Sequence, residues 1–116
     1  MLIFSALSIF IAITIGCAMV FRILTKKPVT VWHKIAHVGM VAVGALLAVI
    51  AAFQTGDMRL WANIALSILV VILGIFVGLK KFRGKTGWFV LVLHAVLATI
   101  CYLILLFNTF AIYSFY

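Results

Sequence analysis

The chain has 116 residues, of which 69% are hydrophobic and 9% are charged, and its mean hydropathy is +1.45. A soluble globular domain carries roughly 45–50% apolar and about 25% charged residues, so this composition excludes that class. It also excludes a disordered chain, and two cysteines are too few for a disulfide-stapled secreted domain. We therefore predict an integral membrane protein whose single domain spans residues 1–116.

Four apolar segments are long enough to cross a bilayer, which takes about 20 residues at 1.5 Å per residue. They run over residues 2–24, 32–53, 60–79 and 88–107. The first lacks the basic start and the cleavage site of a signal peptide, so we expect it to be retained. Because the connections are short, the expected fold class is an all-α membrane protein: a four-transmembrane-helix antiparallel bundle in up-down-up-down order.

The net charge of +8 is distributed unevenly among the connections. The middle connection holds a single basic residue, Arg59, beside Asp57. The basic residues that flank the first connection are Arg22, Lys26, Lys27 and Lys34, and those of the third are Lys80, Lys81, Arg83 and Lys85. By the positive-inside rule both of these connections are cytoplasmic and both termini lie outside the cell membrane. The charge is then expected to attract anionic lipid headgroups and not nucleic acid.

Each segment carries a stripe of small and polar residues at helical spacing, which favours close packing between membrane helices. The stripes are Ser5, Ser8, Ala12 and Gly16; His33, His37, Gly44 and Ala48; Asn63, Ser67, Gly74 and Gly78; and His94, Ala98 and Cys101. We expect these stripes to face other helices and the remaining Leu, Ile, Val and Phe residues to face lipid.

Two histidines are predicted to lie inside the membrane at one depth. His37 and His94 each follow the cytoplasmic end of their helix by about five or six residues, so both are roughly 8–9 Å below that surface. Ionisable side chains inside a membrane are costly and tend to mark functional sites. Gly74 offers a surface without a side chain at a similar depth.

These features suggest a b-type haem or quinone module, in which His37 and His94 are axial ligands and Gly74 lines the pocket. The propionates of a haem would find cations at the same boundary, among them Arg22 and Lys34. Alternatively, the two imidazoles join membrane helices through hydrogen bonds to each other, to a backbone carbonyl or to a hydroxyl. A third possibility is a copper or zinc site in which Cys17 and His33 take part.

The only acid, Asp57, lies in the middle connection, so no predicted span contains a carboxylate. This excludes the small four-helix multidrug exporters that depend on a glutamate inside the membrane. Acid–base pairs, Ser-His-Asp triads and phosphate loops are absent too, so we expect no catalytic activity from this chain alone. Asp57 is expected to be a turn residue.

The run Lys34-Ile35-Ala36-His37 resembles the Lys-Ile-x-His element of the YisL-type uncharacterised membrane proteins. The segment from Lys80 to Gly87 is similar to their basic, Lys/Gly-rich loop. The SirB-type family shares the layout, with an Arg at the end of the first helix and a His early in the second. The YisL-type pattern also has histidines near the N-terminus, which this chain lacks. The resemblance implies a small bacterial four-helix membrane protein, and neither family supplies an activity.

The sequence therefore predicts a small multi-pass protein of the cell membrane that acts as an accessory or structural subunit, in a homo-oligomer or a larger complex. Trp32, Trp61 and Trp88 at the helix ends are typical of interfacial anchors. The alternative is a ligand-binding redox, metal-binding or transport protein that uses the histidines.

Overall fold

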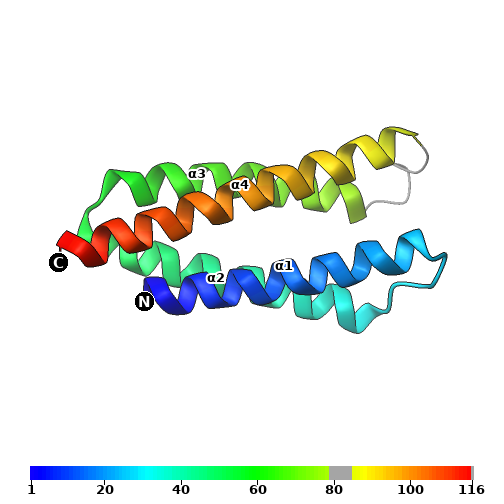
Figure 1. Cartoon of the computed structure of the whole chain (residues 1–116), viewed down its shortest axis with the longest axis horizontal. Coiled ribbons are helices and arrows are strands. Elements are labelled where there is room, and N and C mark those ends of the chain that lie inside the picture. Colours follow the sequence, from blue (N-terminus) through cyan, green and yellow to red (C-terminus); the bar gives the residue numbers. More distant parts are fainter. Residues whose placement is uncertain (79–84, 116) are drawn as a thin grey trace. The chain divides into compact units, whose positions relative to one another are not determined.

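A computed structural model of the chain describes residues 1–78 and 85–115, and these form four α-helices (Figure 1). The helices are α1 (Leu2–Leu24), α2 (Val31–Thr55), α3 (Met58–Gly78) and α4 (Lys85–Phe115). All four are long and apolar enough to cross a membrane. The predicted all-α membrane fold class is thus confirmed. The basic residues Lys80, Lys81 and Arg83 and the predicted end of the third span at Leu79 lie outside the described residues, as does the side chain of Lys85.

The predicted boundaries agree closely for α1 and differ most for α4. The sequence predicts a fourth span that ends at Phe107, whereas α4 continues to Phe115 and reaches 31 residues. No glycine or proline interrupts the chain after Phe107, so nothing in the local sequence ends the helix there. At 1.5 Å per residue α4 is roughly 46 Å long, which exceeds the ~30 Å of a bilayer core.

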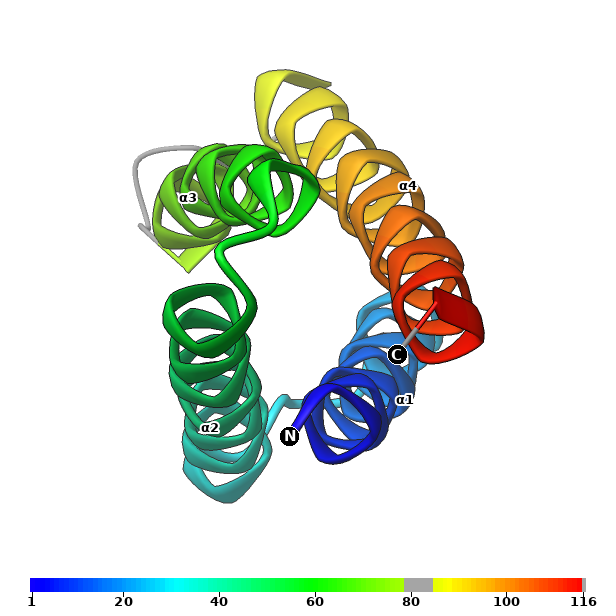
Figure 2. The ribbon, with the colours of Figure 1, turned by 90° about the vertical axis from the view of Figure 1, so that its left-hand side faces the viewer.

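The chain divides into two compact units, Met1–Gly56 and Asp57–Tyr116. In the first unit, hairpin 1, α1 packs against α2, and in the second, hairpin 2, α3 packs against α4 (Figure 2). Each hairpin is antiparallel. Its loop end is where the first helix passes into the second, and its open end is the opposite one. A single packed bundle over residues 1–116 stays a prediction.

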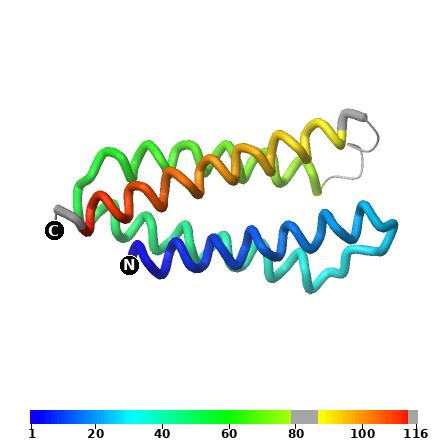
Figure 3. The backbone as a smooth tube through the Cα atoms, in the orientation of Figure 1, coloured from blue at the N-terminus to red at the C-terminus, as the bar shows by residue number. Residues whose placement is uncertain are grey.

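The helix ends of hairpin 1 follow ordinary capping rules, and the backbone path between them can be followed in Figure 3. After α1, Lys26 adopts a left-handed φ of 56°, while the N–H groups of Lys26 and Lys27 donate to the carbonyls of Ile23 and Arg22. This is a Schellman motif, in which a non-glycine residue occupies the left-handed position. Thr30 then caps α2 by accepting a hydrogen bond from the N–H of His33.

Some buried residues of each hairpin belong to the stripes expected from the sequence, whereas others, such as Leu60, Leu105 and Asn108, lie outside those stripes. In hairpin 1 the buried stripe residues are small: Ser5, Ser8, Ala12, Gly44 and Ala48. In hairpin 2 they include Asn63 and Cys101. Large apolar side chains such as Phe4, Phe53 and Phe107 are exposed, as a lipid-facing surface requires.

Candidate functional site

His37 is held in hairpin 1 by one hydrogen bond and one glycine. Its Nδ1 lies 2.7 Å from the carbonyl oxygen of Ala12 on α1. One turn further along α1, a Cβ added to Gly16 would come within 3.2 Å of the imidazole Cε1. The Nδ1–Cε1 edge of the ring therefore lies against the backbone of the neighbouring helix, where the absence of a side chain at Gly16 leaves room for it.

His94 makes the same two kinds of contact in hairpin 2. Its Nδ1 lies 2.9 Å from the carbonyl oxygen of Val70 on α3. A Cβ on Gly74, one turn further along α3, would be 2.9 Å from the imidazole Cε1. The sequence predicts Gly74 as an open surface for a ligand, whereas the structure fills its space with the imidazole of the same hairpin. The absence of a side chain at Gly74 thus makes room for the His94 ring.

The two hydrogen bonds determine the tautomer of each ring. A backbone carbonyl can only accept, so Nδ1 must carry the proton in both imidazoles. In the neutral ring the lone pair is then on Nε2. Many metal-bound histidines have this tautomer, because the Nδ1–H group donates to a second partner while Nε2 binds the metal. Both rings are half-buried.

These paired contacts show that the two hairpins are structural repeats. Adding 58 to a residue number in α1 gives its counterpart in α3, and adding 57 converts α2 into α4. Ala12, Gly16 and His37 thereby become Val70, Gly74 and His94. The sequence analysis did not detect this repeat. Its signal was the recurrence of Leu and Gly at an offset of 58 and of His at 57, beginning with Leu2 and Leu60, both buried.

A second interhelical bond recurs nearer the open end. In hairpin 1 the Ser5 hydroxyl donates to the carbonyl of Gly44 at 2.7 Å. At the equivalent positions of hairpin 2 the Asn63 side chain donates to the carbonyl of Cys101 at 3.0 Å. Ser67 also contacts the Cys101 sulfur at 3.1 Å. The polar stripe residues therefore tie each hairpin together at two matched levels.

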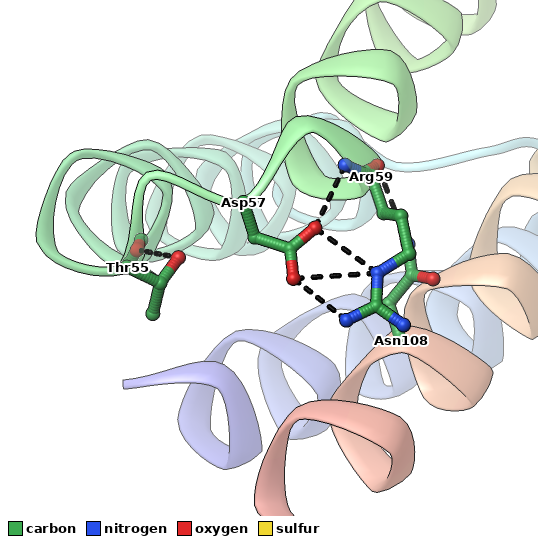
Figure 4. Close-up of polar contacts among 5 residues, drawn as sticks. Thr55, Asp57, Arg59 and Asn108 are labelled. Carbon is green, nitrogen blue, oxygen red and sulfur yellow. Dashed lines mark hydrogen bonds and ion pairs between the residues drawn. The ribbon is translucent and has the colours of Figure 1, made fainter. Parts of the chain in front are cut away.

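The open end of hairpin 2 carries an ion pair (Figure 4). Asp57 Oδ1 accepts from the Arg59 N–H at 2.9 Å, which caps α3, and Oδ2 pairs with the Arg59 guanidinium at 2.7 Å. The hydrogen bonds from the Arg59 side chain and backbone hold the pKa of Asp57 below its ordinary value. The expectation that Asp57 is a turn residue agrees with this geometry.

The residues predicted for a copper or zinc site have separate surroundings in hairpin 1. Cys17 is exposed on α1, and the His33 ring bonds to the Thr30 hydroxyl in the first turn of α2. Within residues 1–78 and 85–115, no group of three or more His, Cys, Asp or Glu side chains could hold a metal ion. A copper or zinc site that uses Cys17 and His33 therefore stays a prediction.

No family model, curated protein or solved structure matches this chain. Membership of the YisL-type or SirB-type families therefore stays a prediction from the sequence.

Proposed function

We propose that this chain is a small multi-pass membrane protein that binds b-type haem, with the Nε2 atoms of His37 and His94 as axial ligands. The observation that carries the proposal is that both hairpins hold an imidazole in the same way. Each hairpin holds one ring by an Nδ1–carbonyl bond against a glycine, and each ring thereby has its lone pair on Nε2.

Haem suits this ligand set better than a bare metal ion does. A tetrapyrrole brings four nitrogens of its own, so the protein need supply only axial imidazoles. The exposed apolar side chains of both hairpins suit the porphyrin, and the basic residues near the loop ends suit its propionates. Arg22 is an example, with one guanidinium nitrogen already bonded to the carbonyl of Pro28.

The test is the absorption spectrum of the full chain, expressed with ample haem and purified in detergent. We expect a Soret band that shifts on reduction, and we expect His37→Ala or His94→Ala to abolish or alter it. His33→Ala is the matched control, because within the described residues the ring of this third histidine bonds to Thr30 beside it, so its loss should leave the band unchanged. A colourless wild-type protein would contradict the proposal.

A structural role as an accessory subunit is the second candidate. It is favoured by the use of the polar stripe side chains. The Ser8 hydroxyl donates to the Met40 carbonyl at 2.8 Å, and this bond, like those of Ser5, Asn63 and both imidazoles described above, joins the two helices of one hairpin. Such bonds stabilise membrane helices without any ligand. Light scattering on the detergent-solubilised chain would test this role. A clean monomer with no co-purifying chain would count against a homo-oligomer or a larger complex.

We also propose that the loop ends face the cytoplasm and both termini face outward, in the cell membrane. The charge distribution in the sequence supports this orientation. An impermeant thiol reagent applied to intact cells should label Thr55→Cys and spare Lys85→Cys, in a background without Cys17 and Cys101. Preferential labelling at position 85 would reverse the orientation.

A further inference from the structure

Hairpin 2 contains a small pocket near its open end. The pocket has a volume of about 240 Å³ and is lined by Arg59, Ala62, Asn63, Leu66, Ile104 and Asn108. Its walls are mostly apolar, and the lining residues belong to the membrane-spanning helices α3 and α4. A molecule that enters this pocket from the side must therefore be soluble in lipid.

The repeat supplies an internal control for the polar side chains of the pocket. Asn108 occupies the position that Ala51 occupies in hairpin 1, and the two residues are equally buried, at 3% exposed. The hairpin fold is thus built with alanine at this position. The buried carboxamide of Asn108 is therefore an addition in hairpin 2, where it bonds across to the Arg59 carbonyl of α3.

The hydrogen bonds of the two carboxamides leave an acceptor on each. Asn63 Nδ2 donates to the Cys101 carbonyl at 3.0 Å, and Asn108 Nδ2 donates to the Arg59 carbonyl at 3.4 Å (Figure 4). In the described part of the chain these bonds use only the amide nitrogens of Asn63 and Asn108. No fully buried side-chain oxygen there lacks a hydrogen-bond partner. Each Oδ1 therefore keeps some accessible surface, and Asn63 and Asn108 both line the pocket.

Charge at the mouth of the pocket does not favour an anion. The guanidinium of Arg59 is paired with the carboxylate of Asp57 at 2.7 Å, so the two charges offset each other. What the pocket offers is two carbonyl-type acceptors in an apolar setting. A matching ligand is neutral, apolar and carries hydroxyl donors, and the volume suits a single ring.

We propose that this pocket binds the hydroxyl-bearing ring of a lipid-soluble phenol or hydroquinone, which donates to Oδ1 of Asn63 or Asn108. Ala62, Leu66 and Ile104 contact the ring face. The site is separate from the surroundings of His94, because the pocket residues lie at the open end of hairpin 2 whereas His94 lies toward the loop end.

The test uses the full chain in lipid nanodiscs, under reducing conditions, with trimethylhydroquinone as the probe. Its dimethyl ether is the matched ligand, because it has the same ring and no donor. Binding is measured as the probe retained above that of protein-free nanodiscs. We expect the ether to bind at least about tenfold more weakly, since it leaves the buried acceptors unpaired. Decanol, an aliphatic alcohol, should also bind more weakly.

Three variants complete the test. Asn108→Ala restores the hairpin 1 residue, Ala62→Leu fills the pocket and keeps both carboxamides, and both should lose binding. Thr99→Val is the control, because its hydroxyl bonds within α4 to the Ala95 carbonyl. Should Asn108→Ala fail to fold, Ala62→Leu decides. Equal binding of hydroquinone and ether, or unchanged binding by Ala62→Leu, would overturn the proposal. His94→Ala should bind the probe normally, so failure here is distinguishable from failure of haem binding.

Discussion

Hairpin 1 and hairpin 2 perform the same packing with different side chains. Both place a histidine on a glycine, and both tie their helices with a side-chain bond to a carbonyl nearer the open end. Hairpin 1 fills the remaining contacts with glycine and alanine. Hairpin 2 uses Cys101, Asn108 and Thr109 at the equivalent positions. What the two share is therefore needed for the repeat, and what differs marks where hairpin 2 has acquired a site of its own.

The largest difference is expected at Gly44 and its counterpart Cys101. A Cβ on Gly44 would lie 2.5 Å from Ile9 Cδ1 and 3.3 Å from the Ser5 backbone oxygen, so Gly44→Val should destabilise the protein by about 2–4 kcal/mol. Cys101→Val should cost only about 1 kcal/mol, because that site already holds a side chain and loses mainly the Ser67 contact. Denaturant unfolding in detergent measures both.

Gly39→Ala is the control for the first prediction, because no atom lies within 4 Å of an added Cβ there. Its unfolding free energy should stay within about 1 kcal/mol of the parent. Equal losses for Gly44→Val and Cys101→Val would show that the two hairpins pack alike at this level.

The two histidines should contribute equally and independently in the haem-free protein. His37→Ala and His94→Ala each remove one interhelical bond, which is worth about 0.6–2 kcal/mol in a membrane. Each imidazole bonds to a carbonyl of its own hairpin, so the double variant should show the sum of the single losses within about 0.5 kcal/mol. A loss clearly below the sum would indicate that the imidazoles are coupled.

The space that glycine leaves for the imidazole should be slightly smaller at Gly74 than at Gly16. Gly74→Ala places a Cβ 2.9 Å from the His94 ring, whereas Gly16→Ala places one 3.2 Å from the His37 ring. We expect Gly74→Ala to cost more, about 1–2 kcal/mol against about 0.5–1 for Gly16→Ala. Nitrogen NMR of the imidazoles should show that the population of the Nδ1–H tautomer falls as the stability falls. In a His37→Ala background Gly16→Ala should have no cost, which tests the contact itself.

The turn after α1 offers a stabilising change. Lys26 has a φ of 56°, which glycine adopts without strain, so Lys26→Gly should stabilise hairpin 1 by about 0.5–1 kcal/mol. At Gly56, with a φ of 65°, the reverse change Gly56→Ala should destabilise by a similar amount. Thermal unfolding checks both, and a loss of stability in Lys26→Gly would mean that the lysine side chain itself is needed.

The smallest effect is expected at Asp57, and it should be confined to hairpin 2. The pKa of this carboxyl is lower in the folded protein than in the unfolded chain, so its contribution is present above the unfolded pKa and disappears as the pH falls through the folded one. Below about pH 4 the first turn of α3 should open more readily. Hydrogen exchange on wild type and Asp57→Asn should converge at low pH. Amides of α1, which begins without a side-chain cap, should not respond.

The sequence by itself determined the four helices and part of the face on which each packs. Apolar runs of about 20 residues without charge have no stable alternative to a membrane helix, because every backbone group must be bonded internally. Stripes such as Ser5, Ala12 and Gly16 are visible because small residues at helical spacing allow close approach. The end of α4 was missed, since apolar residues beyond Phe107 carry no stop signal.

Only the tertiary structure decided what the stripe residues contact. The depth of His37 and His94 is readable from the chain, but their partners are backbone carbonyls, which every residue possesses and no sequence pattern distinguishes. For the same reason Gly74 could be predicted as a special position while its occupant, the His94 ring, could not. The pocket beside Asn108 depends on two residues 45 positions apart, Asn63 and Asn108, that line one space only after α3 and α4 pack.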